Sequence, residues 1–415
     1  MHFCLVTYGT RGDVQPFIYL ALGLKAKGHR VTLAAPENFH QFVKSYGIEF
    51  YPLFGDAEEL VASPECRKVI STGGTFAFAR MALKKMRERQ INILDDVYNV
   101  CKTADAIIAF NPFVFYAAAV AEKLNKKWLL IQLNPPMLPT KAFPMPMFGF
   151  PNIAWLNMHT YAFINNILWQ VQKKDNALFR QRLGLPASKS YLFREVINAK
   201  IPMIHAFSPE LIERPADWDE HFIVAGFFSQ AKRVVIDNPP AELEKWLQAG
   251  EKPLFIGFGS IPFPDPAKLS GIIKELLSTS PTRIIYCRGW SELPDMPISD
   301  RLFVVEQADY SWLLPKCSAA VIHGGIGTVA AALQAGIPVI VASIFVDQPV
   351  WGKIIAQKEL GVHIPWKKLT AMRILKALKT VTKSPIAETI TAVSARLIDE
   401  DGVATAIQAI ERYCS

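Results

Sequence analysis

Short apolar runs alternate along the chain with longer stretches in which apolar residues recur at helical spacing. In the first half, the apolar runs at residues 2–8, 30–35 and 105–110 predict buried strands, and the stretches between them predict helices. A second series of the same kind includes the runs at residues 254–258 and 319–322. Strands that alternate with helices predict parallel, doubly wound sheets, so the predicted fold class is α/β.

The two series predict two Rossmann-like domains that face each other across a cleft. We expect an N-terminal domain over residues 1–232 and a C-terminal domain over residues 253–394. Residues 233–252 contain Asn238-Pro239-Pro240 and are typical of a linker. A chain of 415 residues is long enough to give each domain its own apolar core.

A glycine-rich loop, residues 323–328 with the sequence HGGIGT, lies between a predicted strand and a predicted helix. Glycines let the backbone approach a ligand closely, and the positive start of a helix favours a phosphate group. His323 can donate to a phosphate oxygen, and Thr328 adds a hydroxyl. Asp347 and Gln348 follow the next predicted strand and suit sugar hydroxyls. We therefore predict a phosphate-and-sugar site, although glycines alone also fit an ordinary strand-to-helix turn.

The first predicted strand ends in a second glycine loop, Gly9-Thr10-Arg11-Gly12-Asp13. Open α/β sheets bind ligands at the carboxyl edge where this loop lies. The spacing is G-x-x-G rather than G-x-G-x-x-G, and no acidic residue ends the second predicted strand, so a dinucleotide site is not indicated. The Asp13 carboxylate can take a proton from an attacking hydroxyl. The alternative is that Asp13 caps the following helix through N–H groups near Gln15 and Phe17.

Residues 134–170 interrupt the alternation with six prolines and many Met, Phe, Tyr and Trp side chains. One interpretation is an inserted loop and helix that pack on the core. The other, which we favour, is an apolar wall for a bulky, flat substrate, because Met and aromatic side chains adapt to such surfaces. The candidate acceptor-binding residues are Phe143, Met145, Met147 and Phe148.

The net charge of +8 comes from 45 basic and 37 acidic residues spread along the chain, which does not indicate nucleic-acid binding. A local knot of Lys84, Lys85, Arg87 and Arg89 fits a solvated helix face or a transient contact with a membrane surface. The six cysteines form no CxxC pair, so we expect neither zinc nor disulfides, and a reducing cytoplasm. The N-terminus has no charged region and cleavage site typical of a signal peptide.

One further pattern, Asp217-Trp218-Asp219, has a D-x-D form whose two carboxylates can hold a divalent ion. It follows Arg214-Pro215 and precedes Glu220-His221, which favours a solvated turn. We therefore expect no metal site.

Five segments together carry a resemblance that covers nearly the whole chain. They are GTRGDVQP at 9–16, FIGFGSIPFPDP at 255–266, CRGW at 287–290, HGGIGT at 323–328 and DQPVWG at 347–352. With these segments the chain resembles the UDP-glycosyltransferase superfamily of GT-B fold. It is most similar to sterol 3-beta-glucosyltransferases and to compact bacterial enzymes that glycosylate antibiotics and other natural products.

The resemblance implies an inverting, metal-independent hexosyltransferase that needs no cofactor beyond its co-substrate, a UDP-sugar expected to be UDP-glucose. The acceptor would be a hydroxyl of a lipophilic molecule such as a sterol, triterpenoid, flavonoid or macrolide. Asp13 would be the general base, because this branch places Asp where plant relatives use His. A C-terminal segment, residues 395–415, would cross back to the N-terminal domain. The donor site would use Ser260, His323, Gly325, Gly327 and Thr328 for the diphosphate, Asp347 and Gln348 for the sugar, and Trp290 and Gln307 for the nucleoside.

The chain also departs from the family pattern. The usual double His before the glycines is Ile322-His323, and the His-Asp-Trp run of sterol enzymes is Tyr310-Ser311-Trp312. Asn111 stands nearest to the position of the Asp that orients the catalytic His in plant relatives, so that dyad is absent. Two alternatives stay open at this point, a UDP-sugar 2-epimerase-like enzyme and a non-catalytic nucleotide-sugar or lipid binder of the same fold.

Overall fold

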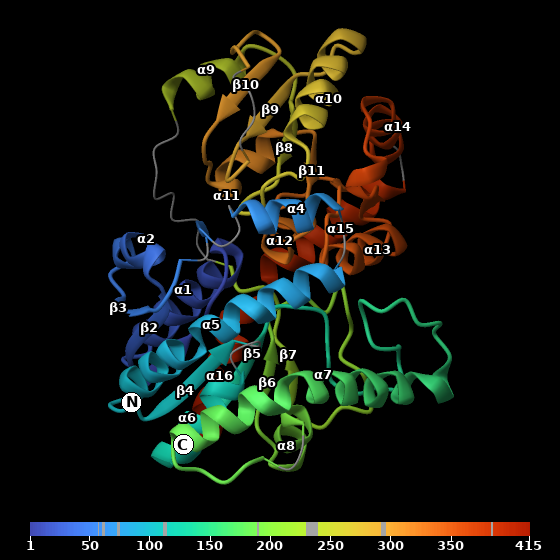
Figure 1. The fold of residues 1–415 in the computed structure, drawn as a ribbon. Coiled ribbons are helices and arrows are strands. Elements are labelled where there is room, and N and C mark those ends of the chain that lie inside the picture. The colour runs from blue at the N-terminus through green and yellow to red at the C-terminus, as the bar shows by residue number, and fades with distance from the viewer. Residues whose placement is uncertain are drawn as a thin grey trace. The chain divides into compact units, whose positions relative to one another are not determined.

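The computed structural model describes most of the 415 residues. The described ranges are 1–56, 58–59, 63–72, 75–110, 114–188, 191–229, 240–291, 296–382 and 385–415. Residue 111 and residues 233–239 of the predicted linker lie outside them. The chain divides into two compact units (Figure 1). Unit 1 comprises Met1–Glu58, Ala79–Ser229 and Asp401–Ser415, and unit 2 comprises Glu59–Phe78 and Gln230–Glu400.

Unit 1 is built on a seven-stranded parallel sheet with the strand order β3-β2-β1-β4-β5-β6-β7. The strands are β1 (His2–Val6), β2 (Arg30–Pro36), β3 (Glu49–Leu53), β4 (Ala106–Phe110), β5 (Lys127–Gln132), β6 (Met203–His205) and β7 (Phe222–Val224). The helices that belong to it are α1 (Arg11–Ala26), α2 (His40–Ser45), most of α5 (Thr75–Cys101), α6 (Val114–Leu124), α7 (Ala154–Arg182), α8 (Leu192–Asn198) and α16 (Gly402–Cys414), with a 3₁₀ turn at Glu37–Phe39.

The apolar run of β1 is continuous because both faces of the sheet are covered. Phe3 and Leu5 belong to one apolar cluster and Cys4 and Val6 to another, and all four are fully buried. Successive side chains of a strand point to opposite faces, so each cluster lies on its own side of the sheet. The first cluster includes residues of α1 and α16, and the second includes residues of α5 and α6.

Unit 2 has a six-stranded parallel sheet with the order β10-β9-β8-β11-β12-β13. The strands are β8 (Leu254–Gly257), β9 (Ile284–Cys287), β10 (Leu302–Val305), β11 (Ala319–Ile322), β12 (Val339–Val341) and β13 (Gly361–His363). The helices are α4 (Pro64–Thr72), α9 (Ala241–Gln248), α10 (Pro266–Thr279), α11 (Tyr310–Leu313), α12 (Ile326–Gln334), α13 (Gln348–Gln357), α14 (Ala371–Val381) and α15 (Ile386–Asp399), with 3₁₀ turns at Leu314–Lys316 and Trp366–Lys368. The predicted α/β class with two doubly wound sheets is confirmed.

In both sheets the first strand along the chain is an interior one. Later strands are added first on one side of it and then on the other, so the strand order reverses. In unit 1 the reversal separates β1 from β4, and in unit 2 it separates β8 from β11. At such a point the following connections leave on opposite faces of the sheet, which opens a crevice at the carboxyl ends of the strands. The topology therefore directs the search for a site to the loops after β1, β8 and β11.

The C-terminal helix α16 completes the core of unit 1 (Figure 1). Ile407 and Ile410 are buried in the same apolar cluster as α1. Gly23 of α1 leaves room for this contact, since a Cβ there would lie 2.6 Å from Ile407 Cδ1 and 2.7 Å from Val403 Cγ1. Asp401 caps the helix by accepting a hydrogen bond from Ala404 N–H at 2.8 Å. Within the described residues, no helix combines the length and apolarity needed to cross a membrane.

Substitution of Ile407 by Ala tests the contribution of α16 to unit 1. Ile407 is 3% exposed, so Ile407→Ala should lower the free energy of unfolding of unit 1 by about 2–5 kcal/mol through lost burial and a residual cavity. Urea unfolding followed by circular dichroism measures the change. Ile398→Ala on α15 is the control, because Ile398 is 74% exposed and should change stability little. A loss of stability in Ile407→Ala as small as that in the control would show that α16 is dispensable for the core.

Candidate functional site

The loop after β11 encloses the side chain of His323. The imidazole is 8% exposed, and a Cβ at position 325 would lie only 2.4 Å from His323 Nε2. From the loop after β8, Gly259 adopts a positive φ of +61°, and a Cβ there would lie 3.5 Å from His323 Cε1. Two glycines, one from the loop after β8 and one from the loop after β11, therefore lie against the His323 ring. Gly325 is required because any larger residue would displace His323.

Burial determines the protonation state of His323. It lowers the pKa of the imidazole to about 4, so the ring is neutral near pH 7. The buried Nδ1 has no hydrogen-bond partner among the described parts of the chain. A neutral imidazole still carries one N–H donor, and a buried polar atom without a partner is rare enough in proteins to call for an explanation such as a ligand. The ring is thus suited to donate a hydrogen bond to an anionic oxygen.

Helix α12 presents its N-terminus beside this ring. Its N-cap is Gly325, which has no side chain to satisfy the first N–H groups. Thr328 N–H and Val329 N–H both donate to Gly325 O, at 3.1 and 3.0 Å. Gly327 is exposed, and a Cβ there would meet no atom within 4 Å, so the chain itself does not require glycine at this position. Close approach of a ligand to the helix start is a physical reason for glycine there.

The loops after β8, β9 and β10 join this region along the carboxyl edge of the sheet. Trp290 N–H donates to Gly259 O at 3.1 Å, and Gly289 N–H donates to Glu306 O at 3.0 Å. Gly289 has a φ of +54°, and a Cβ there would lie 2.2 Å from Gly259 O. Ser260 and Trp290 are half-buried in these loops, and Gln307 is exposed after β10. The structure therefore connects the predicted diphosphate residues to Trp290 through backbone contacts, while Gln307 lies one strand further along the edge.

The loop after β12 holds Asp347 and Gln348 in a constrained conformation. Gln348 is 4% exposed, and its Oε1 accepts hydrogen bonds from the N–H groups of Ile344 and Phe345, at 2.8 and 3.2 Å. Its carbonyl oxygen therefore supports the loop, and its NH₂ group is the donor suited to a ligand. Val346 has a φ of +56°, an outlier for a β-branched residue. Strain of this kind is typical of ligand-binding loops.

Asp347 is the titratable group of this loop. Trp351 of α13 donates its indole N–H to Asp347 Oδ2 at 2.9 Å. Burial nevertheless raises the pKa of Asp347 to about 6. Trp351 is not among the residues predicted from the sequence, although its i+4 spacing from Asp347, which suits a helix, is visible in the segment DQPVW.

In unit 1, Asp13 lies at the third position of α1 rather than at its N-cap. Its Oδ2 accepts hydrogen bonds from Thr10 N–H at 2.7 Å and from Thr10 Oγ1 at 3.2 Å. The bond from Thr10 N–H belongs to a capping box at the start of α1. The predicted alternative of bonds to N–H groups near Gln15 and Phe17 does not describe this contact. The capping box was not predicted, although the spacing Thr10-x-x-Asp13 indicates it.

Gly9 makes room for the carboxylate of Asp13. With its φ of +137°, a Cβ at position 9 would lie 2.2 Å from Asp13 Oδ2. Arg11 and Gly12 belong to the first turn of α1. The Arg11 side chain donates to Gln15 Oε1 at 3.2 Å and lies 4.6 Å from the Phe42 ring centre, whereas Gly12 is exposed. The loop thus orients one half-buried carboxylate at the carboxyl edge of the sheet.

The four candidate acceptor residues lie in a loop that packs on α7. Met145 is 1% exposed and belongs to an apolar cluster with Tyr161 and Ile164. Its N–H donates to Thr160 Oγ1 at 2.8 Å. Phe143, Met147 and Phe148 are half-buried. Met145 therefore belongs to the core of the segment, and the other three side chains retain surface that a ligand can contact.

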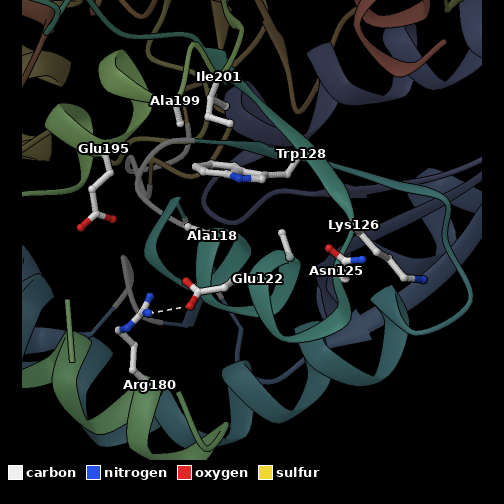
Figure 2. A pocket seen from close by; sticks show the side chains of 10 residues that line it. Ala118, Glu122, Asn125, Lys126, Trp128, Arg180, Glu195, Ala199 and Ile201 are labelled. Atoms are coloured by element: carbon white, nitrogen blue, oxygen red, sulfur yellow. Dashed lines mark hydrogen bonds and ion pairs between the residues drawn. The ribbon is translucent and has the colours of Figure 1, made fainter. Parts of the chain in front are cut away.

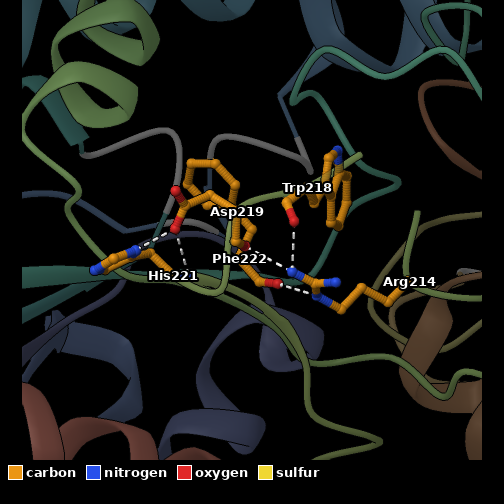
Figure 3. A network of polar contacts seen from close by, with 5 residues as sticks. All are labelled: Arg214, Trp218, Asp219, His221 and Phe222. Carbon is orange, nitrogen blue, oxygen red and sulfur yellow. Dashed lines mark hydrogen bonds and ion pairs between the residues drawn. The ribbon is translucent and has the colours of Figure 1, made fainter. Parts of the chain in front are cut away.

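The two carboxylates of the Asp217-Trp218-Asp219 pattern bind different partners. Asp217 accepts hydrogen bonds from Thr140 Oγ1 at 2.6 Å and from Lys141 N–H at 2.8 Å. These bonds anchor the chain just before Phe143, the first of the four candidate acceptor residues. Asp219 pairs with His221 (Figure 3). The Arg214 guanidinium beneath this turn donates to the carbonyl oxygens of Trp218, Asp219 and Phe222, at 2.7, 2.7 and 2.8 Å (Figure 3). These residues form a structural turn.

A cavity of about 300 Å³ in unit 1 lies away from these loops (Figure 2). It is lined by Asn125 and Lys126, which precede β5, and by Ile201, which precedes β6. It therefore lies at the amino ends of the strands, opposite to the edge that carries Asp13. An ion pair between Arg180 and Glu122, at 2.9 Å, closes one side.

Comparison with protein-family models gives two matches. The Glycosyltransferase family 28 N-terminal domain matches residues 3–138, and the Erythromycin biosynthesis protein CIII-like C-terminal domain matches residues 288–410.

Several curated proteins are similar over the whole chain. Sterol 3-beta-glucosyltransferases UGT80A2 and UGT80B1 of Arabidopsis thaliana are each 32% identical to it, over 428 and 431 residues. The alignments include all of this chain and 66% and 68% of the plant proteins. A sterol 3-beta-glucosyltransferase of Aspergillus clavatus is 32% identical over 427 residues, which is 29% of its own length. The chain thus spans about two thirds of the plant relatives and less than a third of the fungal relative.

Solved structures match the fold at low sequence identity. The glycotransferase of kitacinnamycin superimposes with a TM-score of 0.75 at 18% identity, covering 99% of this chain and 98% of that one. The calicheamicin glycosyltransferase CalG4 has a TM-score of 0.68 at 14% identity, covering 99% and 97%. The glycosyltransferase VinC, in complex with dTDP, has a TM-score of 0.69 at 15% identity, covering 100% and 99%. These structures share the two-sheet fold.

Gly325→Ala tests whether the enclosure of His323 supports nucleotide binding. The added Cβ should displace the imidazole and weaken UDP binding roughly tenfold or more, the loss expected for a hydrogen bond to a charged group. Isothermal titration with UDP measures the effect. Gly271→Ala within α10 is the matched control, because a Cβ there meets nothing within 4 Å. Wild-type UDP affinity in Gly325→Ala would remove this loop from the nucleotide site.

Asp347→Asn tests the raised pKa of Asp347. Because the folded-state pKa, about 6, exceeds the ordinary value of 3.8, the carboxylate destabilises the fold increasingly as pH rises between those values. Asn keeps an acceptor for Trp351, so the variant should equal the wild type near pH 4 and exceed its free energy of unfolding by roughly 1–3 kcal/mol at pH 7. Denaturant unfolding across this pH range measures it. The control is Asp300→Asn, at an exposed carboxylate, which should retain the wild-type dependence of unfolding free energy on pH. The wild-type dependence in Asp347→Asn would contradict a raised pKa for Asp347.

Proposed function

Because the chain belongs to the UDP-glycosyltransferase family, we propose that it is an inverting, metal-independent hexosyltransferase. It transfers glucose from UDP-glucose to a hydroxyl group of a lipophilic acceptor. The observation that carries this proposal is the enclosure of His323 by Gly259 and Gly325 at the point where the unit 2 sheet reverses. Both alternatives, a UDP-sugar 2-epimerase-like enzyme and a non-catalytic binder, lack support from the relatives reported above, which are glycosyltransferases by name.

The diphosphate of the donor would bind at the N-terminus of α12. The N–H groups at the helix start and the His323 ring would donate to its oxygens, and the hydroxyls of Ser260 and Thr328 would complete the set. These dipoles are already oriented in the loop, so they would stabilise the negative charge that grows on UDP as the bond to the sugar breaks. In this arrangement the leaving group needs no metal ion.

The sugar would bind at the loop after β12. The Gln348 NH₂ group would donate to a sugar hydroxyl, and Asp347 would accept from another. A hydroxyl that donates to Asp347 favours its ionised form, so donor binding would lower the raised pKa of this carboxylate. Trp290 and Gln307 would border the nucleoside.

Asp13 would act as the general base. It would take the proton of the acceptor hydroxyl while the oxygen attacks the anomeric carbon, and UDP would leave with the electron pair of the broken bond. Attack opposite to the leaving group inverts the anomeric configuration. The hydrogen bonds from Thr10 support this role because they hold the carboxylate in one orientation at the sheet edge.

The acceptor would contact the half-buried side chains Phe143, Met147 and Phe148, with Met145 supporting the loop from inside. The names of the plant and fungal relatives favour a sterol, while triterpenoids, flavonoids and macrolides share the same flat, apolar character. A cytoplasmic location, a bacterial origin and a transient membrane contact through Lys84, Lys85, Arg87 and Arg89 are parts of this proposal.

The proposal is tested by measuring UDP release from UDP-glucose with a panel of sterols, triterpenoids, flavonoids and macrolides. We expect release that depends on the acceptor, and Asp13→Asn should cut turnover by on the order of 10²- to 10⁴-fold with donor affinity nearly unchanged. Asn at position 13 keeps an acceptor for Thr10 N–H, so the helix start is preserved.

Asp401→Asn is the control, because it makes the same chemical change at the N-cap of α16 and should leave turnover unchanged. Wild-type turnover in Asp13→Asn would exclude Asp13 as the base. UDP binding without release for any acceptor would contradict the proposed transfer from UDP-glucose.

A further inference from the structure

The ring of His363 packs against a glycine in the interior of α13. His363 is the last residue of β13 and is half-buried. A Cβ at Gly352 would lie 2.5 Å from His363 Cδ2 and 2.9 Å from its Nε2. Glycine in the interior of a helix is less favourable than alanine, so α13 loses stability at this position. The space that the His363 ring needs is a physical reason for that glycine.

The same ring binds the loop after β12. His363 Nε2 lies within hydrogen-bond distance of Ser343 Oγ, at 2.8 Å, and Ser343 is 3% exposed. The backbone supports this contact, because Trp366 N–H, beyond the end of β13, donates to Ser343 O at 3.0 Å. Burial, together with the positive charge of Lys353, lowers the pKa of the His363 imidazole. The ring is therefore neutral near pH 7, and the bond to Ser343 joins two uncharged groups.

The residues that follow Ser343 carry the proposed sugar site. The N–H groups of Ile344 and Phe345 donate to Gln348 Oε1 at 2.8 and 3.2 Å, and Val346 then adopts its positive φ of +56°. Ile344 and Phe345 are buried, but apolar packing has no preferred direction, whereas a hydrogen bond has one. A strained residue persists only where the surrounding structure fixes it. The bond from His363 fixes the loop at its β12 end, and Gln348 fixes it at its α13 end.

We propose that His363 is a positioning residue for the donor sugar and acts through Ser343. By holding Ser343, it fixes the turn that orients the Gln348 NH₂ group toward a sugar hydroxyl. This inference rests on the proposed function, because the contact between Gln348 and the sugar belongs to it. His363 should therefore affect the binding of UDP-glucose and not that of UDP, which has no sugar to position.

Isothermal titration of His363→Phe with UDP-glucose and with UDP tests the proposal. Phe keeps a ring against Gly352 but cannot bind Ser343. The affinity for UDP-glucose should fall roughly three- to tenfold, the loss expected for one hydrogen bond, and the affinity for UDP should not change. Ser343→Ala should have the same effect. The double variant should lose no more than either single variant, because both substitutions remove the same bond.

Two controls separate the hydrogen bond from other changes. His363→Gln places an amide within reach of Ser343 Oγ and should retain most of the wild-type affinity for UDP-glucose. Ser278→Ala makes the same chemical change as Ser343→Ala at an exposed position of α10, where Ser278 Oγ donates to Glu275 O at 3.0 Å. It should leave both affinities unchanged.

Hydrogen exchange of the backbone at Ile344 and Phe345 measures the loop without any ligand. Their N–H groups are protected by the bonds to Gln348 Oε1, so exchange should be faster in His363→Phe and unchanged in His363→Gln.

Wild-type affinity for UDP-glucose in His363→Phe and Ser343→Ala would overturn the proposal. An equal loss of UDP affinity would assign the bond to the general stability of unit 2, and failure of His363→Gln to retain affinity would assign the ring to packing against Gly352. Either result would also overturn it. Absence of UDP-glucose binding by the wild type, with faster exchange in His363→Phe, would reject the proposed function and leave the positioning of the loop in place. Binding of UDP-glucose by the wild type, with unchanged affinity and exchange in His363→Phe, would do the reverse.

Discussion

The packing of the His323 ring against Gly325 constrains the loop after β11 at the carboxyl edge of the unit 2 sheet. The ring occupies the space of a Cβ at position 325 and lies beside Gly259 from the neighbouring loop. Gly259 O in turn accepts from Trp290 N–H and excludes any side chain at position 289. A larger residue at position 289 would displace the loop after β8, because Gly259 O occupies the space of its Cβ, and a larger residue at position 325 would displace the His323 ring.

In unit 1, too, a glycine leaves space for a functional side chain, which here is a carboxylate instead of an imidazole. There the carboxylate of Asp13 occupies the space of a Cβ at position 9, and Thr10 holds it through two hydrogen bonds. In both units a glycine at the end of an interior strand makes room for the side chain that the proposed chemistry needs. Such side chains have restricted rotamers before any ligand arrives, which is a condition for electrostatic preorganisation.

Burial has opposite effects on the two titratable groups of the donor loops. It lowers the pKa of His323 and raises that of Asp347, so both groups favour their neutral forms more than they would in water. Val346 adds backbone strain beside Asp347. In the proposed function, a ligand with phosphate oxygens and hydroxyl groups would relieve these features of the unliganded loops.

Apolar periodicity in the sequence determined the α/β class, because strands buried on both faces must be continuously apolar and the helices between them must not be. Glycine spacing located the loops of His323 and Asp13, since positive φ angles and close approaches admit few other residues. Only the tertiary structure decided which groups Gln348 binds, that Met145 is buried, and that the pKa of Asp347 is raised. The partners of these side chains come from loop backbone, packing and burial, which depend on chain geometry that no local pattern encodes.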